Sequence, residues 1–263
     1  MKFDINNPSF LQGASHVGGG IDGDIVISYV NENPSIKLSC TGEVKITCHY
    51  KRSKTVTTVT DVTNETIDLS TPAGSIVTLD GNVTEFSSTS KPYPSDSAVA
   101  SYIKTDGATS LQKIDVSFAE LSELDLTKNT NITSIVASSN KINSLSLSEN
   151  NSVQSIDIKD CLFLSFDGSI APQLNSIDLS GCPIVSLDLL NNDLLTSLDA
   201  VRIESISTIY CAASTQGIAT MLAGMIESSA SVDGTVTLRQ GDEYNQTVID
   251  AAMEKGWDVQ YAE

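Results

Sequence analysis

The sequence predicts a mainly β chain in which a small β domain is followed by a repeat solenoid, with two short strands per 21-residue coil, and by an α/β cap. L-x-x-L-x-L cassettes recur at steps of 10 and 11 residues from Leu111 to Ile206. Short β-branched runs precede them, and the apolar spacing becomes helical after Cys211. Coils of this kind cannot bury their apolar residues alone, so they must stack into one core.

Changes in composition divide the chain into four segments. Residues 1–20 are polar and end in three glycines, which predicts an extended amino-terminal arm. Residues 21–82 form the small β domain, and residues 83–214 form the solenoid with an insertion at 87–110. Residues 215–263 form the cap.

Alternating apolar and polar residues define the strands of the small β domain. The predicted strands are 24–30, 35–40, 43–48, 55–62, 66–69 and 75–79. Thr41-Gly42 predicts a turn between the second and third of them, which would make Cys40 and Cys48 cross-strand neighbours. A short helix is predicted at 95–104, within the insertion.

Within each cassette the first, fourth and sixth residues are expected to point inward, and a residue three positions later closes the turn. The closing residues are Asn129, Asn140, Asn150, Cys161, Cys182 and Asn192. An inward asparagine can bond the unpaired backbone groups of a bend, so we interpret this set, which we call the ladder, as structural. The chain has five cysteines, an odd number that argues against a disulfide framework, and the two in the ladder are expected to be small apolar fillers.

The repeats resemble a known class. Leu124-Asp125-Leu126-Thr127-Lys128-Asn129-Thr130 and the segment 174–182 are similar to the 21-residue leucine-rich repeats of gut Bacteroidota proteins and their phages. The ending Lys255-Gly256-Trp257-x-Val259 resembles the caps of such repeats. We expect the cap to contain a helix at 217–226, a strand at 234–238, a helix at 246–255 and a strand at 257–261, and to cover the last coil.

Outward-pointing residues are the candidates for function. Two rows are expected to lie in register on adjacent coils, and we call them the Ser/Asp face: Ser155, Ser176, Ser197, Asp157, Asp178 and Asp199. Carboxylates about 5 Å apart repel each other. A divalent cation, a basic patch on a partner, or water and salt would each supply the counter-charge, and the small serines favour close approach of another surface.

Charge restricts the partners. The net charge is −18, and residues 111–263 carry 7 Lys/Arg against 21 Asp/Glu. Such a field repels nucleic acid and anionic membranes, so we expect a protein, carbohydrate or cation partner and no nucleic acid or membrane. The two histidines, and the absence of G-x-S-x-G, a phosphate-binding glycine loop and H-E-x-x-H, predict a protein that is not an enzyme and has no cofactor or metal site.

The amino terminus has one basic residue and no apolar stretch, which predicts no secretory signal. Together with the resemblance, this leads us to expect a phage virion accessory protein, a capsid-decorating or fibre-like component made in the host cytoplasm. It would be anchored by its amino-terminal part and would contact virion subunits or a host surface protein, with self-assembly possible. The alternative is a bacterial leucine-rich-repeat adhesin or scaffold at the cell surface, and the third hypothesis is a carbohydrate-active enzyme.

Overall fold

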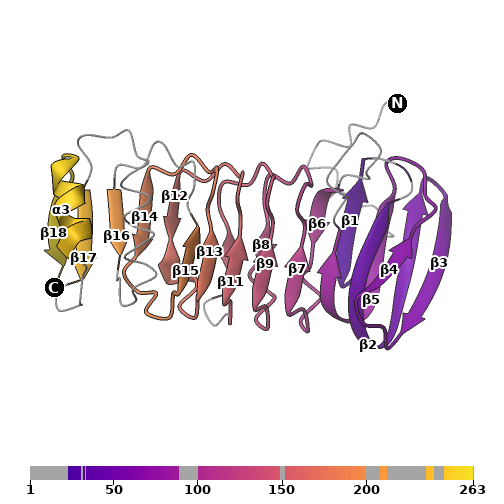
Figure 1. Ribbon diagram of the computed structural model, residues 1–263. Coiled ribbons are helices and arrows are strands. Elements are labelled where there is room, and N and C mark those ends of the chain that lie inside the picture. The colour runs from indigo at the N-terminus through magenta and orange to yellow at the C-terminus, as the bar shows by residue number, and fades with distance from the viewer. Residues whose placement is uncertain are drawn as a thin grey trace.

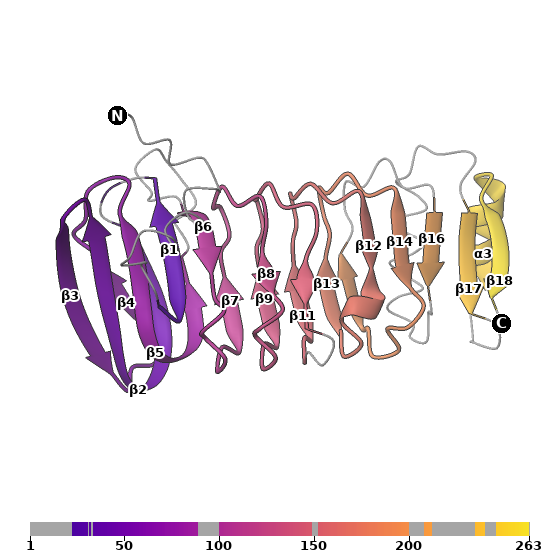
Figure 2. The same cartoon turned by 180° about the vertical axis from the view of Figure 1, so that it is seen from behind.

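The computed structural model is an elongated stack of strands, with a broad antiparallel sheet at one end and a helix at the other (Figure 1). The view from behind shows the second column of strands (Figure 2). The structure describes residues 23–30, 32, 34–88, 100–148, 152–199, 208–211, 235–239 and 246–262. The predicted arm at 1–20 lies outside these ranges.

The amino-terminal part is an antiparallel sheet. Its strands are β1 (Ile25–Tyr29), β2 (Ser35–Tyr50), β3 (Ser53–Thr60), β4 (Glu65–Asp68), β5 (Ile76–Ser87) and β6 (Ala100–Lys104). Strand β5 lies between β1 and β2, and β1 also pairs with β6. Both β3 and β4 pair with β2.

The predicted turn at Thr41-Gly42 is wrong, because β2 runs through it as one 16-residue strand. Gly42 adopts a φ of 74°, and the register against β5 shifts on both sides of Cys40. The extra residues are therefore absorbed as a bulge that bends the strand without reversing it. As a result Cys40 and Cys48 lie on the same strand.

The predicted helix at 95–104 is also wrong over its described part, because residues 100–104 form strand β6. Ile103 of β6 pairs with Ile27 of β1, and its side chain is buried. Pairing with the edge of β1 satisfies the backbone of this segment, so tertiary context overrides its local pattern. Residues 95–99 lie outside the described ranges.

Strand β5 joins the antiparallel sheet to the solenoid. Its end, Glu85–Ser87, pairs in parallel with β7 (Lys113–Asp115). Parallel strands follow at every coil: β9 (Ser134–Val136), β11 (Ser155–Asp157), β13 (Ser176–Asp178) and β15 (Ser197–Asp199). These strands and the antiparallel ones form a single 11-stranded sheet within the described residues, which we call the long sheet.

The second column of strands forms the opposite side of the stack. It comprises β8 (Asp125–Leu126), β10 (Ser146–Leu147), β12 (Ser165–Asp167), β14 (Ser186–Leu189), β16 (Thr208–Cys211), β17 (Thr235–Arg239) and β18 (Asp258–Ala262). In the described part of the chain it divides into a two-stranded sheet, β8–β10, and a five-stranded sheet from β12 to β18. A short 3-10 helix (Gly168–Ile170) follows β12.

The core is a continuous column of aliphatic side chains between the two sides. The residues at the fourth cassette position in the long sheet illustrate this burial. Each of their side chains is at most 1% exposed: Ile114, Ile135, Ile156, Ile177 and Leu198. Residues on adjacent coils pair 21 positions apart, as Ile156 does with Ile177. The predicted fold class, a mainly β chain with a solenoid of two short strands per coil, is confirmed.

The ladder bonds the bends of successive coils. The Asn140 amide donates to the carbonyls of Val116 (2.9 Å) and Ala137 (2.8 Å), and its Oδ1 accepts the Leu121 N–H (3.1 Å). The amides of Asn129 and Asn192 also donate to backbone carbonyls one coil earlier. Asn150 lies outside the described residues.

Two cysteines take the asparagine position in the ladder. Cys161 Sγ donates to Ala137 O (3.2 Å) and Cys182 Sγ to Ile158 O (3.0 Å), and both thiols are buried and free. Burial raises the pKa of Cys161 to about 11 and also raises that of Cys182.

Because only the thiolate is nucleophilic, we expect the Cys161 thiol to resist alkylation at pH 8 in the folded protein and to react quickly after denaturation. The raised pKa also makes the free energy of unfolding depend on pH. The contribution of the buried neutral thiol is complete at neutral pH and is lost as the pH rises from 9 towards 11, because the thiol ionises at a lower pH in the unfolded chain. Mass spectrometry after iodoacetamide treatment, with and without urea, measures the reactivity. Equal labelling of Cys161 in both samples would contradict the burial.

The cap extends the second column. Helix α3 (Gln246–Glu254) ends at Gly256, whose φ is 89°, with Gly256 N–H bonded to Met253 O and Trp257 N–H bonded to Ala252 O, both at 3.0 Å. This pair of bonds is a Schellman motif. Trp257 is buried, and β17 and β18 continue the parallel sheet. The helix expected at 217–226 lies outside the described residues.

In the described part of the chain the cap adds to the last coil directly, because β17 pairs in parallel with β16. Strand β18 ends the five-stranded sheet. Its inner-face residue Tyr261 is 54% exposed, whereas its register partner Leu238 is 3% exposed. The cap therefore lengthens the five-stranded sheet by two strands, β17 and β18.

Candidate functional site

The structure brings the Ser/Asp face together on the outer surface of the long sheet. Ser155 pairs with Ser176, and Ser176 pairs with Ser197. The aspartates are in the same register, with Asp178 between Asp157 and Asp199. Adjacent strands lie about 4.8 Å apart, so each row is continuous over three coils. The structure describes the backbone of Asp199 but not its side chain.

Asp157 and Asp178 each have a local structural role that sequence reasoning did not foresee. Oδ1 of Asp157 accepts the N–H of Lys159 (3.3 Å), and Oδ1 of Asp178 accepts the N–H of Ser180 (2.9 Å). The same bond to the residue two positions later is made by four other aspartates in or at the end of strands: Asp115, Asp125, Asp167 and Asp188. An aspartate that bonds its own backbone in this way initiates a turn. The repeated acid therefore starts a turn at these six positions.

A lysine within the chain supplies counter-charge to this face. Lys159 Nζ lies 3.3 Å from Asp157 Oδ2 and 3.9 Å from Asp178 Oδ2. The charge of Asp157 and its hydrogen bond raise the pKa of Lys159. The sequence signal was a lysine two positions after a strand-ending aspartate, which places it in the turn beside the carboxylates. This cation differs from the three sources of counter-charge considered from the sequence.

The site is polar and offers no metal cage in the part of the chain that the structure covers. There, no group of three or more His, Cys, Asp or Glu side chains is arranged to hold a metal ion. Likewise, none of the described helices combines the length and apolar character that a membrane crossing requires.

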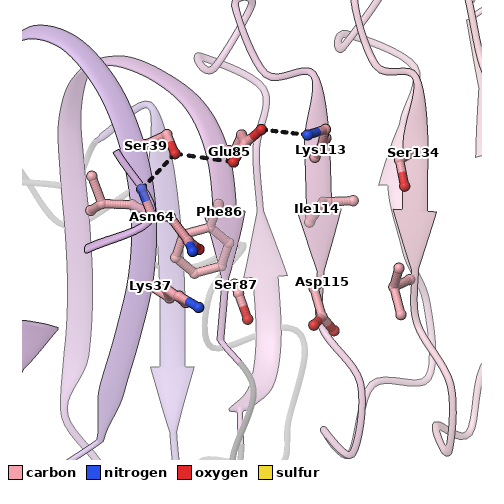
Figure 3. Close-up of a pocket in the computed structure, with 12 residues that line it drawn as sticks. Lys37, Ser39, Asn64, Glu85, Phe86, Ser87, Lys113, Ile114, Asp115 and Ser134 are labelled. Atoms are coloured by element: carbon pink, nitrogen blue, oxygen red, sulfur yellow. Dashed lines mark hydrogen bonds and ion pairs between the residues drawn. The ribbon is translucent and has the colours of Figure 1, made fainter. Parts of the chain in front are cut away.

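A cleft of about 290 Å³ lies where the antiparallel sheet meets the solenoid, beside the Ser/Asp face (Figure 3). It opens over strands β2, β5, β7 and β9. Its charged and polar lining includes Lys37, Ser39, Asn64, Glu85, Ser87, Lys113, Asp115 and Ser134. The sequence did not predict it, because the pairing of β5 with both β2 and β7 that creates it was not apparent.

Glu85 links the two sides of the cleft (Figure 3). Its carboxylate accepts bonds from Lys113 Nζ (2.6 Å) and from the Ser39 hydroxyl (3.0 Å). The bond from Lys113, followed by that from Ser39, lowers the pKa of Glu85 in spite of partial burial. The Ser39 oxygen in turn accepts the Asn64 N–H (2.9 Å), so one network joins β2, β5 and β7 with the loop before β4.

We expect Lys113→Met to raise the pKa of Glu85 towards its ordinary value, because the largest stabiliser of the carboxylate is removed. In the unmodified protein the contribution of this pair to stability is present above the ordinary pKa of a glutamate and is lost on acidification through the lowered value. A carboxyl ¹³C NMR titration of both proteins measures the shift, with Lys141→Met as a control on the distant Lys141–Glu120 pair. The same Glu85 pKa in both proteins would contradict the conclusion that Lys113 lowers it.

Comparison with known proteins gives a distant likeness of fold. No protein-family model matches the sequence, and no curated protein matches it. A solved structure of the functional domain of InlJ from Listeria monocytogenes, described as including a cysteine ladder, matches at 17% identity with a TM-score of 0.32. The match covers 41% of this chain and 28% of that chain. This likeness of fold has no bearing on a phage or virion origin.

Proposed function

We propose that the protein is a non-catalytic binding protein whose long sheet presents the Ser/Asp face to a protein partner, as a bacterial leucine-rich-repeat adhesin or scaffold does. The observation that carries the proposal is the register of this face. Serines with partly exposed side chains stand in line on adjacent strands, beside a row of aspartates whose charge is only partly compensated by Lys159.

The shape of the face supports binding to a broad surface. Ser155 and Ser176 have the smallest polar side chains, so the backbone of a partner can approach the sheet closely. Acidic groups beside them favour a partner with basic residues, because opposite charges across an interface steer association and fix its orientation. The cleft at the end of the face adds a concave element to an otherwise even surface.

The chemistry of the carboxylates supports a non-catalytic role. Asp157 and Asp178 each bond a backbone N–H, and Lys159 lies between them. Glycoside hydrolysis requires two carboxyl groups on either side of a bound sugar, one of them kept protonated by its surroundings. Two neighbouring carboxylates that share a lysine on an open sheet do not provide that arrangement.

A blocking variant tests the proposal. Ser155→Arg/Ser176→Arg places two long cationic side chains on the face, whereas Ser165→Arg/Ser186→Arg makes the same change on adjacent strands of the second column. We expect a protein captured from cell extracts by the unmodified chain to bind the control variant equally well. Its affinity for the face variant should fall at least tenfold, about 1.4 kcal/mol, by calorimetry with the purified partner.

Two results would overturn this function. One is capture of partners that bind the face variant and the control variant with the same affinity. The other is hydrolysis of a glycan by the unmodified chain that is lost in Asp157→Asn. Thermal unfolding of all variants establishes that each remains folded.

A further inference from the structure

Strand β3 is an edge of the long sheet, at the extreme of the molecule opposite the cap (Figures 1 and 2). Within the described residues it pairs with β2 alone. Seven of its eight residues are exposed, and Val59 is partly buried. In an antiparallel pair every second residue directs its N–H and C=O away from the neighbouring strand. The outer side of β3 therefore presents backbone groups to which another strand can bond.

The composition of β3 suits it to a second strand partner. Six of its eight residues are threonine or valine, β-branched types that pack well against cross-strand neighbours. Proteins often protect an edge strand with several charges or a proline, but β3 carries the single charge of Lys54 and no proline. Val56 is 47% exposed. The edge is thus long, β-prone and weakly protected.

Strand β4 prolongs this edge. Because β5 lies along one side of β2, both β3 and β4 pair with its other side. The N–H of Asp61 bonds the Gly42 carbonyl (3.2 Å), and the Val62 carbonyl accepts the N–H of Cys40 (2.9 Å), so β2 also holds the segment between the two strands. The edge therefore extends from residue 53 to residue 68, which we call the β3–β4 edge.

Opposite charges lie at the two ends of the β3–β4 edge. Residues 51–68 contain three basic residues, all at the hairpin-turn end, and three acidic residues, all at the other end: Lys51, Arg52 and Lys54, and Asp61, Glu65 and Asp68. On β2, Glu43 and Lys37 pair with residues 60 and 66 behind the acidic end, where their charges offset each other. The edge as a whole is neutral, but it has a basic end and an acidic end.

This separation of charge distinguishes between the ways in which two such edges can pair. Two copies running in the same direction would place basic turn beside basic turn and acid beside acid. Two antiparallel copies would place each basic turn beside the acidic end of the other copy, which is favourable at both ends. Since like charges directly opposite each other destabilise a strand pair, the charges select the antiparallel arrangement.

We propose that two copies of this chain form a dimer by antiparallel pairing of their β3 strands, about a twofold axis near Thr57. This register sets Ser53 of one copy opposite Asp61 of the other, so that Arg52 and Lys54 flank that carboxylate. The threonines and valines of the two strands become cross-strand neighbours. Such an interface uses the same surface on both copies and closes at two. Both solenoids extend away from the junction, because β3 lies at the far end from them (Figure 1).

Charge reversal at each end of the β3–β4 edge provides the test. Lys51→Glu/Arg52→Glu makes the turn end acidic, and Glu65→Lys/Asp68→Lys makes the other end basic. Asp61 is left unchanged, because its Oδ1 accepts the N–H of Gly42 (2.7 Å). Either variant alone places like charges together in the antiparallel pair. An equimolar mixture of the two restores opposite charges at both ends of a mixed pair.

Matched controls carry the same changes of charge on the solenoid. They are Lys128→Glu/Lys141→Glu and Glu120→Lys/Glu123→Lys, at exposed positions. Sedimentation velocity of each full chain, over a range of concentrations at low ionic strength, measures the mass of the species present. The mixture also reports on folding, because only folded variants can associate with each other.

We expect the unmodified chain and both controls to reach twice the 27.9 kDa of one chain as concentration rises. Each edge variant alone should dimerise at least tenfold more weakly, and the mixture should recover the dimer. The proposal is overturned by an unmodified chain that stays monomeric or forms a series of larger species. It is equally overturned by edge variants that dimerise as well as the controls, or by a mixture that stays as monomeric as its components.

Discussion

Replacing Asn140 with alanine is expected to lower the free energy of unfolding by about 3 kcal/mol or more. The Asn140 amide bonds two carbonyls and its oxygen bonds the Leu121 N–H, all inside the stack. A buried hydrogen bond contributes about 1 kcal/mol, and each backbone group left without a partner costs about 1–3 kcal/mol. Alanine fills none of these roles and leaves a cavity between two coils.

Urea denaturation followed by circular dichroism measures this loss. Asn175→Ala is the matched control, because Asn175, just before β13, is only partly buried, and it should change stability by less than about 0.5 kcal/mol. Equal losses in the two variants would show that the ladder is not what holds the bends.

Gly81→Ala is expected to cost about 3 kcal/mol, for two separate reasons. Gly81 has a φ of 138°, a conformation that side chains rarely adopt. An added Cβ would also collide with the Glu43 carbonyl oxygen and lie 3.0 Å from Val44 Cα, both backbone atoms of the neighbouring strand. Neither can move without opening the β2–β5 pairing at the bulge, where the Gly81 N–H also bonds Asp24 Oδ2 (2.7 Å).

The control for Gly81 is Gly74→Ala. Gly74 has a φ of 78°, but an added Cβ would meet no atom within 4 Å. Its substitution carries the conformational penalty alone, about 1 kcal/mol. The difference between the two variants in urea denaturation isolates the close approach at the bulge. If both lose the same stability, the packing of β2 against β5 at this point is looser than described.

The solenoid was predictable because its information is local and repeated. An inward residue such as Ile156 has equivalents one coil away on each side, so the period alone fixes strand spacing, register and burial. The closing residues were identifiable for the same reason. The turn at Gly42 and the helix at 95–104 failed because neither position repeats, and each was decided by a strand distant in sequence.

The candidate site was predictable only in its layout. The rows of Ser155 and Asp157 followed from the 21-residue period, but the use of Asp157 as a turn-forming residue depends on a bond to its own backbone that spacing does not reveal. The position of Lys159 depends on the path of that turn. The cleft at Glu85 depends on long-range pairing of β5 with two other strands, which a single sequence does not disclose.

The central claim is that the outer face of the long sheet is one continuous surface built at a constant step. Spin labels at positions 113 and 197, both exposed and four strands apart in the same row, test it directly by pulsed electron paramagnetic resonance. At about 4.8 Å per strand the labelled backbone positions should be about 19 Å apart, with labels at 113 and 155 at half that separation. Separations that do not grow in proportion to the number of coils would contradict the account.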